Sequence, residues 1–208
     1  MSGAEGRPAR SGTSPAGSPA GGRRLSEEER ARARTRELPD LVADGLVLLL
    51  CGINPGLGSA AAGHHFANAG NRLWPALHRS GFTPRQLSGP EDHELLSLGI
   101  GITSLVARPT ARAGELTPAE IRAGGRGLRA HVRRLSPAWL AMLGISAYRT
   151  AFDAPDATVG PQEITIGPTR VWVLPNPSGL NAHYPPRALA AEFTRLREAM
   201  GLPGRHTG

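Results

Sequence analysis

Apolar residues along the chain gather into short continuous runs. Three of these runs, 45–52 (GLVLLLCG), 99–106 (GIGITSLV) and 138–143 (AWLAML), are almost wholly apolar. Runs of this length and composition are typical of strands that are covered on both faces of a parallel sheet. The sequence therefore predicts at least three buried, parallel strands.

Residues 163–175 (EITIGPTRVWVLP) follow a different pattern, in which apolar and polar positions alternate on either side of a turn. The apolar positions are Ile164, Ile166, Val171 and Val173. Gly167 and Pro168 are typical turn residues, so this segment predicts a hairpin.

Segments with helical signals lie between and after these runs. Thr117 is suited to cap a helix, because Pro118 follows in the first helical position and Glu120 in the third. Further helices are predicted at 71–80, 90–98, 145–152 and 185–200, and a shorter one from the capping box of Ser26 and Glu29 toward Pro39. Strands that alternate with helices predict an α/β fold, a three-layer αβα sandwich with a mostly parallel central sheet.

Length and composition predict one folded domain with short tails. The 208 residues suit a single domain, which we place at residues 37–202, followed by a C-terminal tail at 203–208. Residues 1–36 contain eight Arg and four Glu, and up to Arg24 they are mostly Gly, Ser, Pro and Ala. Such a segment cannot bury enough apolar surface to offset the entropy of ordering it, so we expect a basic tail that is disordered or weakly helical.

The charge balance favours polyanionic partners. The formal net charge is +7, and all 24 basic residues are Arg, which makes nucleic acid the first candidate. The longest apolar run, 46–51, is far shorter than the roughly 18 residues that span a bilayer, and the N-terminus has no apolar signal region. We therefore expect a cytoplasmic protein without a membrane-spanning segment.

Neither a metal nor a cofactor is expected. Cys51 is the only cysteine, and it ends a buried run, so we expect an inert small hydrophobic side chain. His64 and His65 are adjacent and would point apart on an extended loop. Residues 56–61 fit the dinucleotide-binding pattern G-x-G-x-x-A, but no acidic residue closes a second strand about 20 residues later, and we expect the segment to continue as a loop.

Two motifs follow predicted strands. Parallel sheets bind their ligands at the carboxyl ends of their strands, so these motifs are candidates for a binding site. GINPG occupies residues 52–56 and NPSGL residues 176–180. Between them lie FANAGNRLW (66–74), GITSLVARPT (101–110) and AGGRGL (123–128). In this order the segments resemble the mismatch-specific uracil-DNA glycosylases, including the thymine-DNA glycosylases, within the uracil-DNA glycosylase superfamily. The resemblance covers about residues 44–200 and implies a uracil-DNA glycosylase-like fold.

The resemblance implies a monofunctional glycosylase that flips uracil out of a G·U-mismatched duplex and hydrolyses its N-glycosidic bond, leaving an abasic site. By similarity, Asn54 is a catalytic residue that holds the attacking water, although an amide cannot act as a strong general base. Asn176 stands where the uracil-specific branch has a His, so weaker assistance to the departing base is expected. The preferred base stays open among uracil, ethenocytosine, hypoxanthine and thymine.

The resemblance also assigns residues that bind the base and the DNA. Phe66 is expected to stack on the flipped base, and backbone groups near Ile53 and Phe66 to face its edge. Ser59 is a candidate for contact with a DNA phosphate. Ser104 is an auxiliary candidate, since a hydroxyl can bind a water but not deprotonate it.

The NPSGL segment is implied to enter the duplex. Leu180 resembles the wedge that fills the gap left by the flipped base, and Gly179 allows close approach of the backbone. An Arg that some relatives carry two residues after this Leu is here Ala182, which puts the reading of the opposite guanine by that side chain in doubt. The candidates to replace it are Asn181, His183 and Arg187.

Several alternatives remain open. Asn54 could serve only the turn before Pro55, Phe66 and Leu180 could be core residues, and Ser104 could be structural. At the level of function, the alternative is a non-catalytic module that binds mispaired or damaged DNA. A deaminase, which also flips bases, would need H-x-E and P-C-x-x-C patterns that the sequence lacks. We expect a monomer that acts on double-stranded DNA.

Overall fold

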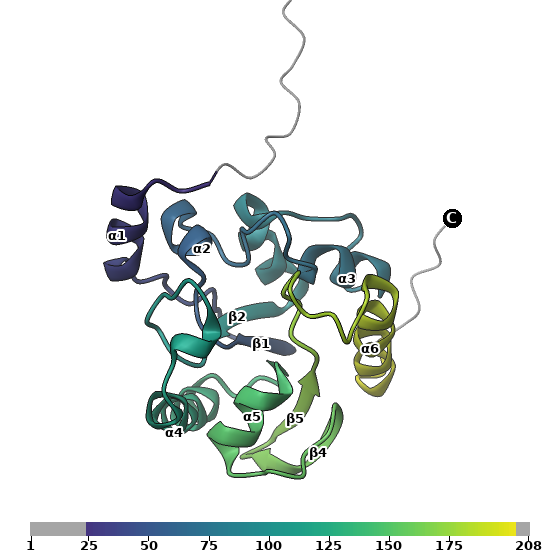
Figure 1. Ribbon diagram of the computed structural model, residues 1–208. Coiled ribbons are helices and arrows are strands. Elements are labelled where there is room, and N and C mark those ends of the chain that lie inside the picture. Colours follow the sequence, from purple (N-terminus) through teal and green to yellow (C-terminus); the bar gives the residue numbers. More distant parts are fainter. Residues whose placement is uncertain (1–23, 203–208) are drawn as a thin grey trace, which may run out of the picture.

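A five-stranded sheet forms the centre of the computed structural model, which describes residues 24–202 (Figure 1). The strands are β1 (Leu48–Gly52), β2 (Ile100–Ser104), β3 (Trp139–Leu143), β4 (Gly160–Ile166) and β5 (Thr169–Leu174). Their order is β2-β1-β3-β5-β4, and all neighbours run parallel except β4, which pairs antiparallel with β5. The predicted tail at 203–208 and the first 23 residues of the predicted N-terminal tail lie outside the described residues.

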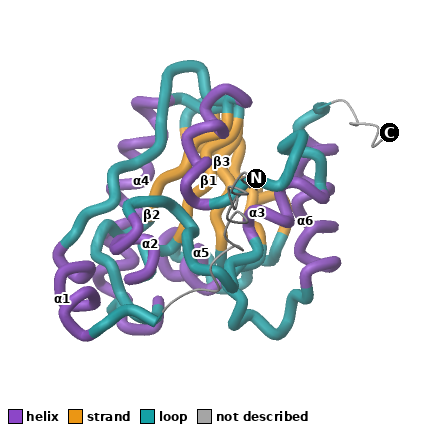
Figure 2. Tube along the Cα trace, turned by 90° about the horizontal axis from the view of Figure 1, so that it is seen from above, coloured by secondary structure: helices purple, strands orange, loops and turns teal. Residues whose placement is uncertain are grey.

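Helices cover both faces of this sheet (Figure 2), which confirms the predicted α/β sandwich. On one face lie α3 (Leu73–Arg79), the 3₁₀ helix η1 (Gly89–Leu98) and α6 (Pro186–Ala199). On the other face lie α4 (Pro118–Leu135) and α5 (Ile145–Phe152). No helix within residues 24–202 is both long and apolar enough to cross a membrane.

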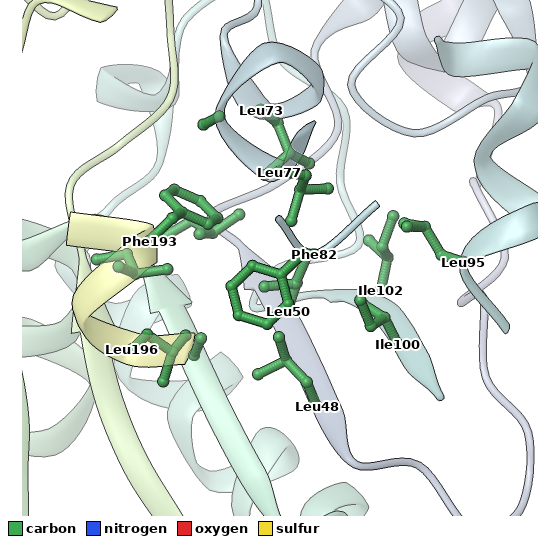
Figure 3. Close-up of a cluster of buried hydrophobic side chains, with 14 of the residues drawn as sticks. Leu48, Leu50, Leu73, Leu77, Phe82, Leu95, Ile100, Ile102, Phe193 and Leu196 are labelled. Carbon is green, nitrogen blue, oxygen red and sulfur yellow. The ribbon is translucent and has the colours of Figure 1, made fainter. Parts of the chain in front are cut away.

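Each strand supplies side chains to two cores, because successive residues point to opposite faces of a sheet. Leu48 and Leu50 of β1 pack with α3 and α6, whereas Leu49 and Cys51 pack with α4 and α5. Burial raises the pKa of the Cys51 thiol, so the thiol stays protonated and unreactive, as predicted. Figure 3 shows the first core, in which Leu48 and Leu50 meet Leu73, Leu77, Phe193 and Leu196.

One helix precedes the first strand, and another follows it. The segment after β1, which we expected to be a loop, contains the short helix α2 (Leu57–Ala62), so that expectation was wrong. Its Ser-Ala-Ala-Ala sequence favours a helix, and the left-handed Gly63 ends it. The capping box of Ser26 and Glu29 is present and begins α1 (Glu27–Thr35), which packs on α2 through the buried Ala33.

The segment predicted as a helix at 90–98 is a 3₁₀ helix rather than an α-helix. Arg85 binds Glu91 at 2.6 Å and Glu94 at 2.7 Å. Residues three apart lie above one another in a 3₁₀ helix, so both carboxylates reach the same guanidinium.

The hairpin forms at Gly167 and Pro168 as predicted, but its alternation is broken in β4. A register shift between Pro161 and Thr165 leaves Ile164 38% exposed, whereas Ile166 is buried. A bulge of this kind changes the face to which the following side chains point.

Candidate active site

The two motif loops meet at one edge of the sheet. Because β2, β1, β3 and β5 run parallel, their carboxyl ends share this edge, where GINPG ends β1 and NPSGL follows β5. A cavity of about 320 Å³ opens between the loops. Of the residues predicted for the site, those that line this cavity are Ile53, Asn54, Ser59, Phe66, Ser104, Asn176 and Leu180.

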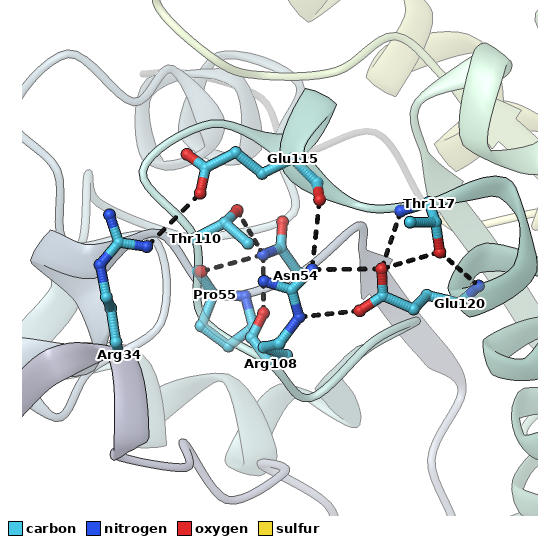
Figure 4. Close-up of polar contacts among 8 residues, drawn as sticks. All are labelled: Arg34, Asn54, Pro55, Arg108, Thr110, Glu115, Thr117 and Glu120. Atoms are coloured by element: carbon cyan, nitrogen blue, oxygen red, sulfur yellow. Dashed lines mark hydrogen bonds and ion pairs between the residues drawn. The ribbon is translucent and has the colours of Figure 1, made fainter.

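The amide of Asn54 is held in one orientation by the loop that follows β2 (Figure 4). Its Nδ2 donates to the carbonyl oxygen of Arg108 at 2.8 Å and to the hydroxyl oxygen of Thr110 at 2.7 Å. A carbonyl oxygen can only accept, so the group that faces Arg108 must be the amide NH₂. The amide oxygen Oδ1 takes part in none of these bonds and is the atom left to accept from a water.

Backbone pairing holds the same two loops together. The Thr110 N–H donates to the Pro55 carbonyl at 3.1 Å, and the Thr110 carbonyl accepts from the Leu57 N–H at 3.1 Å. The Val106 N–H donates to the Ile53 carbonyl at 3.0 Å. These bonds extend the parallel pairing of β1 with β2 beyond the sheet, so Asn54 sits in a fixed backbone frame.

An ion pair anchors the loop that orients Asn54. The Arg108 Nε lies 2.7 Å from Glu120 Oε1 and its Nη2 lies 3.1 Å from Oε2, an arrangement that uses both carboxylate oxygens. Glu120 also caps α4 by accepting from the Thr117 N–H at 2.8 Å. Arg108 and then Thr117 lower the pKa of Glu120 to about 2, so its carboxylate is ionised at neutral pH.

Phe66 lines the cavity in an unusual backbone conformation. Its φ is 50°, in the left-handed region that residues other than glycine seldom adopt. Its ring lies against Gly52, where an added Cβ would come within 3.2 Å of the ring, and its carbonyl accepts from Trp74 Nε1 at 3.2 Å. The ring is only partly buried at the edge of the core, which leaves a face to the cavity.

Buried polar groups hold the segment that carries Phe66. The His65 N–H donates to Asp92 Oδ2 at 2.9 Å, and His65 Nε2 lies 2.9 Å from the Pro39 carbonyl oxygen. Burial lowers the pKa of His65, although the Pro39 carbonyl and Asp92 act in the opposite direction. The ring is therefore neutral at pH 7, with its proton on Nε2, toward Pro39.

The two predicted serines differ in their surroundings. Ser59 is only 4% exposed, and its hydroxyl accepts from the Ala67 N–H at 3.1 Å. This bond ties α2 to the Phe66 segment, and contact between Ser59 and DNA stays a prediction. Ser104 ends β2 opposite Gly52, is half-buried and borders the cavity.

Asn176 and Asn181 organise the second loop. The Asn176 Oδ1 accepts from the Ser178 N–H at 2.9 Å, which leaves the amide NH₂ as its donor group at the cavity. The Asn181 Nδ2 donates to the Asn176 carbonyl at 2.9 Å, and its Oδ1 accepts from the His183 N–H at 3.2 Å. The Asn181 side chain is thus engaged within the loop, and its contact with DNA stays a prediction.

Leu180 stands out at the tip of this loop. Its side chain is 87% exposed, far more than any other large hydrophobic residue within residues 24–202, so the alternative of a core residue is wrong. Gly179 lies so close to the Gly70 carbonyl oxygen that a Cβ at position 179 would collide with it. The loop therefore needs a glycine at this position.

Sequence reasoning missed four residues that hold the site. Arg108 and Thr110 lie in the GITSLVARPT segment, and Arg72 lies in FANAGNRLW, but no role was assigned to them. Glu120 was predicted only as a helix cap. The available signal was the single Arg inside each of these two segments, GITSLVARPT and FANAGNRLW. The partners of each Arg are set by the tertiary structure.

Among models of protein families, that of the Uracil DNA glycosylase superfamily matches residues 39–198 of the chain. The match spans more than half of the chain, including all five strands and both motif loops. It also contains every residue predicted for the site.

Proposed function

The chain belongs to the uracil DNA glycosylase superfamily, and from this premise we propose that it excises uracil from G·U-mismatched double-stranded DNA. The observation that carries the proposal is the oriented amide of Asn54, whose NH₂ is bound by Arg108 and Thr110 while Oδ1 is left for a water. The products are free uracil and an abasic site. The protein acts as a monomer, without a metal or a cofactor.

The cavity supplies the contacts that hydrolysis of an N-glycosidic bond requires. A uracil flipped out of the duplex enters it and stacks on Phe66. The water held by Asn54 Oδ1 attacks the sugar carbon C1′, while the C1′–N1 bond breaks and its electron pair leaves with the base. The attacking water releases its proton to solvent. The Asn176 NH₂ donates a hydrogen bond to the departing base.

The residues that line the cavity favour substrates whose base is a good leaving group. None of the lining residues within the described part of the chain is Asp or Glu. Asn54 positions the water but cannot act as a strong general base toward it. Bond breaking must therefore run ahead of attack, which favours uracil over bases that depart less readily.

The exposed loop supports duplex DNA as the substrate. Leu180 fills the space that the flipped nucleotide leaves in the stack. The Gly179 and Asn181 carbonyls lie beside it and each accept only one hydrogen bond from Arg72, so each keeps a lone pair for the N–H groups of the opposite guanine.

The test is a single-turnover excision assay. The protein is incubated with end-labelled duplexes that contain U·G, U·A or T·G, and abasic sites are cleaved by alkali. Cleavage at uracil in U·G above that in U·A supports the proposal. Equal cleavage of both duplexes would contradict mismatch selectivity, and tight binding without cleavage would identify a DNA-binding module instead.

A further inference from the structure

Arg72 connects the two loops that the proposed reaction uses. It precedes the first residue of α3, at the end of the segment that begins with Phe66. Its backbone N–H donates to the Pro177 carbonyl at 2.8 Å, which joins this segment to the start of the Leu180 loop. The connection is thus already present in the backbone.

The Arg72 guanidinium binds the same loop at three further points. Nη2 donates to the Gly179 carbonyl at 2.8 Å, and Nη1 donates to the Asn181 carbonyl at 3.1 Å and the Tyr184 carbonyl at 2.9 Å. These acceptors lie on both sides of Leu180. One planar side chain therefore fixes the backbone from which the exposed leucine projects.

The remaining surroundings of Arg72 favour this role over an ordinary ion pair. No carboxylate pairs with Arg72 in residues 24–202. Its side-chain hydrogen bonds go to backbone carbonyls, so they fix the position of the loop backbone. The close approach of Gly179 to the Gly70 carbonyl draws the two loops together at the same place.

We infer that Arg72 is a positioning residue that holds the DNA-inserting loop 177–184 against the base-stacking segment 66–71. The inference rests on the proposed function, since it assigns Leu180 to the duplex. With the clamp in place, the wedge is ordered before DNA arrives, so binding does not have to supply the cost of ordering it. Without the clamp, the Asn54 amide keeps its contacts with Arg108 and Thr110, but the wedge loses its fixed position.

The experiment compares Arg72→Met with Arg79→Met. Arg79 is the exposed last residue of α3 and has no described contact with the loop. Its substitution therefore removes one positive charge but no hydrogen bond to the loop. A hydrogen bond from a charged donor typically changes an equilibrium about tenfold, so Arg72→Met should slow single-turnover excision from U·G duplex at least about tenfold. Arg79→Met should leave the rate within about twofold of the parent, as expected for a surface substitution.

A double-mutant cycle separates the clamp from a general structural role. If Arg72 acts mainly through Leu180, Arg72→Met should have a several-fold smaller effect on duplex excision in a Leu180→Ala background than in the parent. The same factor of loss in both backgrounds would overturn the inference. Full restoration by Arg72→Lys would also overturn it, because a point charge can replace a phosphate contact but not three directed hydrogen bonds.

Hydrogen exchange of the free protein tests the clamp without any activity. Amides at 178–184 should exchange faster in Arg72→Met, or in Arg72→Lys if the first variant does not fold, while amides of β1 and β3 should not change. Unchanged exchange in the loop would overturn the inference. If the parent excises no uracil but exchange rises in the loop, the proposed function fails and the clamp stands.

Discussion

The cavity lies between two loops that are held in different ways. The Asn54 loop is joined to the loop after β2 by successive backbone hydrogen bonds, which continue a pair of parallel strands. The Leu180 loop has one backbone bond to the Phe66 segment and otherwise relies on side chains, chiefly that of Arg72. Its tip stands in solvent.

The difference matches the role that we propose for each loop. A residue that positions an attacking water must be placed within a fraction of an ångström, which a continuous backbone frame provides. A wedge has to extend beyond the surface to reach between bases, so it cannot be part of a sheet. Separate supports allow the chemistry and the insertion to be changed independently.

Removal of the Asn54 amide should have the largest effect on excision. Asn54→Ala should lower the single-turnover rate on U·G duplex about a hundredfold, the usual loss for one positioned polar group. Binding to the same duplex should remain, because the wedge and Phe66 are unchanged. Excision at the parent rate would refute the role of Asn54.

Asn54→Asp tests the orientation of the amide. One carboxylate oxygen would take the place of Nδ2, 2.8 Å from the Arg108 carbonyl oxygen, and two acceptors would then face each other. We therefore expect no gain in rate at neutral pH, although a carboxylate is a better base. A faster variant would show that the Arg108 contact does not control the orientation of residue 54.

Truncation of the wedge should separate duplex from single-stranded substrates. Leu180→Ala should lower excision from U·G duplex, about tenfold or more, since one buried apolar side chain contributes about 1.5–3 kcal/mol. Its rate on single-stranded DNA and its melting temperature should not change, because Leu180 packs into no core. Equal losses on both substrates with a lowered melting temperature would contradict the assignment.

Loss of the Arg108–Glu120 pair should have a moderate effect that acts only through Asn54. Arg108→Met should slow excision about tenfold, on single-stranded and duplex DNA alike, as expected for a slight misplacement of a reacting group. Arg85→Met, which breaks a similar exposed pair outside the cavity lining, is the matched control. Additive losses of Arg108→Met and Asn54→Ala would contradict this coupling.

The smallest effect should be a pH dependence of stability through His65. Burial lowers the pKa of His65 in the folded state, so the unfolded chain binds a proton more readily as the pH falls below about 6.5. The melting temperature should therefore decrease between about pH 7.5 and 5.5, and His65→Gln should reduce this decrease. His93→Gln, at an exposed position, should leave the decrease as it is in the parent.

The sequence determined most of the framework. Continuous apolar runs predicted β1, β2 and β3 because both faces of each strand are covered, and the Thr117 capping box predicted the start of α4. The capping box at Ser26 also predicted α1. These signals are local, so they can be read without knowledge of the partners.

The tertiary structure alone decided how the site is held. Neither the orientation of the Asn54 amide nor the neutral state of His65 follows from local sequence, because Arg108, Thr110 and Asp92 come from distant segments. The helix α2 forms where we expected a loop, and its partners Thr110 and Ala33 come from distant segments of the chain. The clamp formed by Arg72 lies more than 100 residues from the carbonyls it binds. The motifs predicted residues that line the cavity, and only the tertiary structure shows which residues keep them in place.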